Sequence, residues 1–194
     1  MKDIIIGIGA CRDGTTTLFN ILKRIYNLNN CKNEIAHQKD HMYIYNQFSK
    51  FKETGNLKYK NNITNKIKKW KKGSVIIGNG YCLVLDIINK IHNNQVKVIH
   101  LKRNKKDWLE SFINNVNSFP WSHGNYSKIK KPKINRIAAF QFKEMTISSW
   151  NKLSLEKKSL WYYKKTHSII DNYRKNNDKN ILVRTESLSK VSTV

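Results

Sequence analysis

The segment Ile4-Ile-Ile-Gly-Ile-Gly-Ala-Cys-Arg-Asp-Gly-Thr-Thr-Thr-Leu18 decides the fold class. A β-branched apolar run of the kind that forms buried strands leads into a Gly-rich turn, and a helical pattern starts at a Thr triplet. Gly9 and Gly14 let the backbone curl so that N–H groups point at an anion, and the new helix adds the positive end of its dipole. We therefore expect an anion-binding loop at the carboxyl end of a first, parallel strand.

Apolar runs and helical patterns alternate along the rest of the chain. The expected strands are Asp3–Ile8, Ser74–Ile77, Lys97–Leu101 and Asn180–Val183, with a weaker candidate at Glu34–Ala36. The expected helices are Thr15–Tyr26, Tyr81–His92, Lys106–Asn117, Arg136–Trp150 and Leu155–Lys175. The alternation is typical of a parallel sheet that is covered on both faces. The predicted fold is therefore α/β, a three-layer parallel sheet with helices on both faces. No linker or repeat interrupts it, so we expect a single domain over residues 1–194.

The composition excludes several classes of protein. With 39% hydrophobic and 11% aromatic residues, the 194-residue chain can bury a core, unlike a disordered basic tail. Three cysteines are too few and too widely spaced for a disulfide scaffold, and no Cys/His cluster has zinc spacing, so we expect no metal. No apolar stretch approaches the roughly 20 residues of a spanning helix, and the run Ile4–Ile8 is too short for a signal peptide. We expect a soluble, cytoplasmic protein with reduced thiols.

The charge is strongly positive, at 37 Lys and Arg against 13 Asp and Glu, or +24, which predicts an anionic partner. Only 6 of these basic residues are Arg, while 25 residues are Asn. Two explanations fit this excess of lysine and asparagine: the bias of an AT-rich genome, or a functional surface that binds polyanions. Because arginine is scarce, each one is more informative than each lysine. The arginines are Arg12, Arg24, Arg103, Arg136, Arg174 and Arg184.

The densest basic segment is Lys50–Lys72. It carries Ile63, Ile67 and Trp70 at helical spacing, which predicts a surface helix with one apolar stripe and a solvated basic face. The basic face has two further interpretations. It is either a groove-lining helix for nucleic acid, or a cover or landing surface for an acidic acceptor.

The spacing of the loop glycines is close to that of the nucleotide P-loop, GxxxxGK[ST], so the predicted sheet is P-loop-like. Thr15 stands where that motif has its lysine, which argues against hydrolysis of ATP or GTP. The cation lies inside the loop instead, at Arg12, whose guanidinium suits bidentate contact with an oxyanion. Thr15, Thr16 and Thr17 add hydroxyl donors. Asp13 places a carboxylate beside the anion site and weakens binding unless it is turned away.

The loop pattern G-x-x-R-x-G-T-T resembles the 5′-phosphosulfate loop of the sulfotransferase family, in which Pro and Ser usually stand at the positions of Cys11 and Asp13. The resemblance implies that the donor 3′-phosphoadenosine 5′-phosphosulfate is bound by Arg12, Asp13, Gly14, Thr15, Thr16 and Thr17. It also implies that Arg12 acts in catalysis, because it would neutralise charge on the transferring oxygens, and that no metal is needed.

A second segment also resembles the sulfotransferase family, and it follows the first at the distance along the chain that the family has. The strand Lys97–Arg103 ends in an arginine, and Ser111 follows eight residues later on a helix that Asn104 and Asp107 cap. This pair is similar to the 3′-phosphate site of sulfotransferases, and Ile181–Leu188 is similar to the last core strand of the family. The resemblance therefore runs from Ile4 to about Leu188. It implies transfer of a sulfuryl group to a hydroxyl or amine of a small-molecule or carbohydrate acceptor.

The general base is expected after the weak second strand. Lys39-Asp40-His41-Met42-Tyr43 is similar to the K-E-x-H-F-F stretch that holds the catalytic glutamate in the heparan-type branch, with one residue fewer. The resemblance places Asp40 in that role. His41 is the second candidate and His37 the third, since histidine is a frequent general base. A polar loop without a catalytic role is the alternative.

One family feature is absent from the sequence, a basic Gly-containing loop near the C-terminus that closes over the 3′-phosphate. Lys130, Lys131 or Lys133 would substitute for it; otherwise the sequence is truncated or donor binding is weaker than usual.

Two other functions compete with this one. A P-loop kinase of small metabolites would need a cation on the γ-phosphate and carboxylates that hold Mg²⁺, and neither stands at the expected positions. A non-catalytic, basic nucleic-acid-binding protein would bind less tightly as salt rises. It would also carry clustered base-reading arginines or stacking aromatics, which the sequence does not show as a motif, so nucleic acid is not the expected partner.

Overall fold

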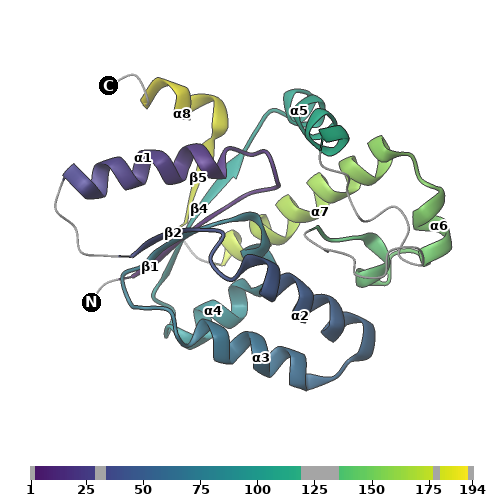
Figure 1. The fold of residues 1–194 in the computed structure, drawn as a ribbon, viewed down its shortest axis with the longest axis horizontal. Coiled ribbons are helices and arrows are strands. Elements are labelled where there is room, and N and C mark those ends of the chain that lie inside the picture. Colours follow the sequence, from purple (N-terminus) through teal and green to yellow (C-terminus); the bar gives the residue numbers. More distant parts are fainter. Residues whose placement is uncertain (1–2, 29–33, 119–135, 177–179, 192–194) are drawn as a thin grey trace.

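A computed structural model describes residues 3–28, 34–118, 136–176 and 180–191. Five parallel strands form one sheet in the order β2-β3-β1-β4-β5, as predicted for an α/β protein (Figure 1). The strands are β1 (Ile4–Ile8), β2 (Ile35–His37), β3 (Val75–Ile77), β4 (Val96–Lys102) and β5 (Ile181–Arg184). The weak candidate strand is therefore real, one residue later than expected.

Helices cover both faces of the sheet (Figure 1). The α-helices are α1 (Thr15–Leu28), α2 (His41–Thr54), α3 (Leu57–Ile67), α4 (Leu85–Ile91), α5 (Lys105–Ser118), α6 (Ile147–Lys152), α7 (Leu155–Lys175) and α8 (Thr185–Val191). Two 3₁₀ helices are η1 (Asn79–Val84) and η3 (Ala139–Phe142). Helices α1 and α8 lie over one face, and α2, α3, α4 and α7 lie over the other, which confirms the three layers. None of the described helices is both long and apolar enough to cross a membrane.

The order of the strands locates a crevice. From β1 the chain leaves through α1 toward β2 at one edge, whereas from β4 it leaves toward β5 at the other edge. Strands β1 and β4 are nevertheless neighbours, with Ile4 opposite Val96 and Ile8 opposite His100. The connections diverge at this pair, so the loops after β1 and β4 leave a crevice at their carboxyl ends, where open α/β sheets bind ligands.

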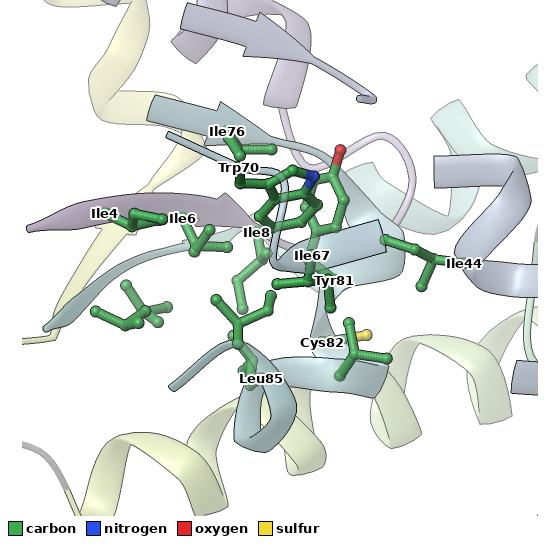
Figure 2. Packing of buried hydrophobic residues seen from close by; sticks show 14 of the residues in the cluster. Ile4, Ile6, Ile8, Ile44, Ile67, Trp70, Ile76, Tyr81, Cys82 and Leu85 are labelled. Carbon is green, nitrogen blue, oxygen red and sulfur yellow. The ribbon is translucent and has the colours of Figure 1, made fainter. Parts of the chain in front are cut away.

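Strand β1 alternates between the two layers. Ile4, Ile6 and Ile8 are buried in the cluster shared with α2, α3 and α4, which Figure 2 shows from close by. Gly7 faces the opposite layer, where a Cβ would lie 2.9 Å from Cδ2 of Leu18 in α1. The missing side chain therefore lets α1 approach the sheet closely, and this approach sets where the N-terminus of α1 points.

The expected helix Arg136–Trp150 is wrong. The segment holds the short η3, a turn at Lys143 in the left-handed region (φ 58°), and then the separate helix α6, which Thr146 begins by accepting a hydrogen bond from the N–H of Ser149. Ala138 and Ala139 are fully buried, with Ala138 in an extended conformation. The irregular stretch buries its apolar side chains directly, without forming the apolar face of a helix. Tertiary packing therefore overrides the helix propensity of this segment.

The basic segment Lys50–Lys72 is likewise not one helix. Gly55 ends α2 in the left-handed region (φ 68°), and Asn56 caps α3 by accepting from the N–H of Lys58. The predicted apolar stripe is confirmed, because Ile63, Ile67 and Trp70 are all buried, although Trp70 lies beyond the end of α3. The expected helix Tyr81–His92 begins as the 3₁₀ helix η1 and becomes α-helical at Leu85.

Candidate active site

The loop between β1 and α1 is tightly curled. Arg12 (φ 78°) and Gly14 (φ 88°) both adopt left-handed conformations. A glycine reaches that region without penalty, whereas an arginine held there costs about 1–3 kcal/mol and needs support from its surroundings. Gly9 is also required, because a Cβ there would lie 2.7 Å from the carbonyl oxygen of Leu101. The loop therefore holds Arg12 in a backbone conformation that glycine adopts without strain but arginine does not.

Asp13 supplies the support from inside the loop. Its side chain is fully buried, and its carboxylate accepts hydrogen bonds from the N–H of Ala10 and, at 3.2 Å, from the N–H of Arg103. Its carbonyl oxygen accepts from Oγ1 of Thr185 at 2.6 Å. Burial raises the pKa of this carboxyl above its usual value. The carboxylate is turned inward, away from any anion, so Asp13 ties β1 to β4 rather than facing the donor as expected.

Arg12, Arg103 and Ser111 surround one space. Nε of Arg12 donates to Oγ of Ser111 at 3.2 Å, so two side chains expected at separate phosphates touch each other. Two open cavities of about 620 and 600 Å³ meet at Arg12 and Arg103, which line both. The larger cavity is also lined by Gly14, Thr15, Thr16 and Thr17, and the other by Ser111. The structure therefore brings the predicted anion-binding residues together, with the exception of the Asp13 carboxylate.

The first turn of α1 adds to this site. Its leading N–H groups have no acceptor within the helix, and with the helix dipole they attract an oxyanion. Two acidic side chains, Asp107 and Glu186, also line the larger cavity. Oε1 of Glu186 accepts from the N–H of Asn104 at 2.7 Å, and this hydrogen bond lowers the pKa of Glu186. The site is thus a mixed-charge space with two arginines, rather than a uniformly basic surface.

Helix α7 holds the site from behind. Its Tyr162 hydroxyl oxygen accepts from the N–H of Cys11 at 3.0 Å, and its Tyr163 hydroxyl donates to the carbonyl oxygen of Arg103 at 2.7 Å. Nε2 of His167 lies 3.2 Å from Oδ2 of Asp13. One helix therefore contacts both anion-binding loops. The sequence predicted α7 with the observed bounds but not this role. The sequence signal that could have revealed this role was the presence of tyrosine and histidine, whose side chains end in polar groups, on the buried face of the helix.

The sequence of residues 4–185 matches the family model for the sulfotransferase domain. The chain belongs to the sulfotransferase family. None of the curated proteins matches the sequence significantly. Among solved structures, a sugar kinase from a Janibacter species has a TM-score of 0.46 at 9% identity, covering 98% of this chain and 90% of its own. The shikimate kinase of Acinetobacter baumannii in complex with shikimate has a TM-score of 0.40 at 11% identity, covering 91% of this chain and 96% of its own.

The three candidates for the base of this sulfotransferase lie outside the anion site. Among the described residues that line the two cavities, none is Asp40, His41 or His37. Oδ2 of Asp40 accepts from Nε1 of Trp70 at 3.1 Å, and Oδ1 lies 3.0 Å from Nζ of Lys66. Both carboxylate oxygens therefore have partners, and the side chain joins the start of α2 to the end of α3.

The two histidines differ from Asp40. His41 is buried, its Nδ1 has no hydrogen-bond partner among the described residues, and burial lowers its pKa to about 4. The ring is therefore neutral near pH 7 and able to accept a proton. His37 is half-buried, stacks on Phe19 at a centroid distance of 5.4 Å, and has its pKa lowered by burial.

Lys130, Lys131 and Lys133 lie outside the described residues. Within the parts of the chain that the structure describes, no group of three or more His, Cys, Asp and Glu side chains is placed to hold a metal ion.

Proposed function

We propose that this member of the sulfotransferase family transfers a sulfuryl group from 3′-phosphoadenosine 5′-phosphosulfate to a hydroxyl or amine. One observation carries the proposal: Arg12 and Arg103 line two neighbouring cavities at the divergence point of the sheet, and Ser111 lines one of them. A donor with two anionic groups needs two such cavities, each with a guanidinium, because a guanidinium binds an oxyanion in bidentate fashion.

The two ends of the donor fit different walls. The 5′-phosphosulfate would lie against the first turn of α1, where Thr15, Thr16 and Thr17 offer hydroxyl and N–H donors beside Arg12. The 3′-phosphate would lie between Arg103 and Ser111, in the neighbouring cavity. Each phosphate contact with a charged donor contributes about 1.5–3 kcal/mol, so losing one arginine weakens binding by roughly 10–100-fold.

The chemistry requires one bond to form as another breaks. The acceptor oxygen or nitrogen forms a bond to sulfur, the bond from sulfur to the bridging phosphate oxygen breaks, and adenosine 3′,5′-bisphosphate leaves. Charge grows on the bridging oxygen as it leaves, which the Arg12 guanidinium and the N–H groups of the loop stabilise. The acceptor proton goes to a base, a transfer that contributes typically about 10²–10⁴ in rate.

The geometry changes the order of the candidate bases. His41 offers a neutral ring with a free Nδ1, whereas both oxygens of Asp40 already have partners. Nε2 of His37 also has no hydrogen-bond partner among the described residues, so we place His41 first, His37 second and Asp40 third. The acceptor is a small molecule or a carbohydrate, and a cytoplasmic location belongs to the same proposal, because Cys11 and Cys82 are free thiols.

Ligand-induced thermal stabilisation tests the donor site. At 100 times its Kd, a ligand stabilises the folded protein by about 2.7 kcal/mol. We expect adenosine 3′,5′-bisphosphate to raise the melting temperature of the wild type. In Arg12→Ala or Arg103→Ala, a roughly 10–100-fold weaker Kd should reduce the stabilisation to about 0.4–1.4 kcal/mol. Arg24→Ala is the matched control, because Arg24 is exposed on α1 outside both cavities. Stabilisation by Mg·ATP alone would indicate a kinase and overturn the proposal.

Turnover tests the base. His41→Gln keeps a polar side chain of similar size but accepts no proton at neutral pH. We expect it to abolish sulfuryl transfer while leaving the bisphosphate shift intact. Asp40→Asn is the companion variant: loss of transfer in Asp40→Asn with activity retained in His41→Gln would restore the order that the sequence suggested.

A further inference from the structure

Four titratable side chains form a buried row behind the anion site. Oδ2 of Asp13 lies 3.2 Å from Nε2 of His167, and Nδ1 of His167 lies 2.8 Å from Nε2 of His100. Nδ1 of His100 lies 3.3 Å from Oδ1 of Asp171. His100 is fully buried in β4, His167 is 3% exposed in α7, and Asp171 reaches the surface. The row therefore runs from the anion-binding loop through two histidines to the solvent.

Other groups face this row from the elements packed around it. The Tyr163 ring lies edge-on to His167 at a centroid distance of 4.2 Å. Nζ of Lys102 and Nη1 of Arg174 lie 3.5 and 3.3 Å from Asp171. The cations thus gather at the outer end, around Asp171. At the inner end, His167 is the ring that meets the buried Asp13 carboxylate.

The row contains three close contacts, and the 2.8 Å contact between the two imidazoles is a hydrogen bond. Two lone pairs that face each other at this distance away from water repel, so one of the two rings donates a hydrogen to the other. Burial lowers the pKa of His100 to about 3, so that ring is neutral, and burial raises the pKa of Asp13. The ring of His167 is therefore the side chain that joins the neutral His100 to the buried Asp13 carboxyl.

This pairing matters because Asp13 joins the two anion-binding loops. Its carboxylate accepts from the N–H of Ala10 in the first loop and from the N–H of Arg103 in the second. A carboxylate that lost its partner in the interior would be an uncompensated buried charge, which proteins avoid by rearranging. Any movement of Asp13 would change the spacing between Arg12 and Arg103.

We propose that His167 is a positioning residue for the anion site: it holds the Asp13 carboxylate in the place from which Asp13 fixes the loops of Arg12 and Arg103 relative to each other. His100 and Asp171 orient the His167 ring from behind. The effect on ligands rests on the proposed function, whereas the effect on the loops does not depend on any ligand.

Amide hydrogen exchange, followed by NMR on the full chain, tests the effect on the loops. In His167→Leu, we expect the N–H groups of Ala10 and Arg103 to exchange about tenfold faster, which corresponds to about 1.4 kcal/mol. His92→Leu is the matched control, since His92 is also a buried histidine (7% exposed) but caps α4, outside the row. In His167→Gln, the amide reaches the Nε2 position and donates to Asp13, so slow exchange should return.

Binding is measured with adenosine 3′,5′-bisphosphate and with the two adenosine monophosphates. His167→Leu should weaken the bisphosphate about tenfold or more and each monophosphate less than about threefold, because only the bisphosphate senses the spacing of both loops. Equal exchange at Ala10 and Arg103 in His167→Leu and His92→Leu would overturn the positioning role, as would a His167→Gln variant that behaves like His167→Leu. A wild type that binds no bisphosphate would overturn the proposed function instead, and the exchange data would still decide the role of His167.

Discussion

The carboxyl ends of the sheet divide into two unlike halves. After β1 and β4, Arg12 and Arg103 line open cavities, and their loops are held from behind by buried hydrogen bonds. After β2 and β3, His41 and Asn79 are only 5% and 7% exposed, and Tyr81 is fully buried. One half is therefore open and lined by two arginines, whereas the other packs its side chains in the interior.

The difference shows how the work of the site is distributed. Binding an anionic donor needs fixed cations at the surface, which the β1/β4 half provides. The β2/β3 half holds His41, whose ring is neutral near pH 7 because burial lowers its pKa. Tyr162 joins the halves, because its hydroxyl oxygen accepts from the N–H of Cys11 and, at 3.5 Å, from Nδ2 of Asn79.

The largest effect is expected from Trp108, which lies behind the open half. Its ring is fully buried, and Nε1 donates to the carbonyl oxygen of Cys11 at 2.7 Å. Trp108→Ala should lower the free energy of unfolding by about 3–5 kcal/mol and weaken bisphosphate binding. Trp150→Ala is the matched control: Trp150 is equally buried but belongs to a separate cluster around η3 and α6. Urea denaturation and calorimetric titration measure the two effects, and equal losses of affinity in both variants would contradict a local role for Trp108.

An intermediate effect is expected from His41 in the β2/β3 half. Its pKa is about 4 in the folded protein against an ordinary value of 6.5, so the unfolded chain takes up the proton first as the pH falls. The free energy of unfolding should therefore decrease between about pH 6.5 and 4, by about 3 kcal/mol from this residue alone. His41→Phe should flatten the profile of stability against pH in that window. His100, whose pKa is also lowered by burial, still gives the variant a slope of the same sign. The test is therefore the difference between the two profiles, and identical profiles in wild type and variant would show that His41 is not neutral in the folded state.

The smallest effect concerns the link between the halves. Tyr162→Phe removes the oxygen that serves Cys11 and Asn79 and leaves two donors unsatisfied, at a cost of about 1–3 kcal/mol. Tyr59→Phe on α3 is the control and should change stability by less than about 0.5 kcal/mol. Urea denaturation compares the two. A cost for Tyr162→Phe no larger than for the control would mean that the halves are held independently.

The open half was predictable because its signals are local. A strand, a glycine turn and a helix start follow one another within Ile4–Leu18, so their chemistry is visible in a single segment. The same locality explains why the bounds of α7 agree with the prediction: Ser154 caps it, and its pattern is uninterrupted through Lys175. Arg12 and Arg103 were found for the same reason, each at the end of an apolar run.

The remaining features depend on contacts between distant residues. That the Asp13 carboxylate would turn inward depends on His167 and Arg103, and that Asp40 would be engaged depends on Lys66 and Trp70. No window of sequence contains these partners together. The irregular path around Ala138 has the same origin, because its conformation is set by what it packs against rather than by its own propensity.

The dependence of the anion site on α7 has a consequence for synthesis of the chain. Cys11 and its partner Tyr162 are 151 residues apart. At typical rates of translation, about 8–30 s pass between the two. During that interval the arginines exist without the helix that places their loops. A ligand of the anion site can therefore stabilise the fold only once α7 has been made, and the N-terminal half of the nascent chain lacks that stabilisation.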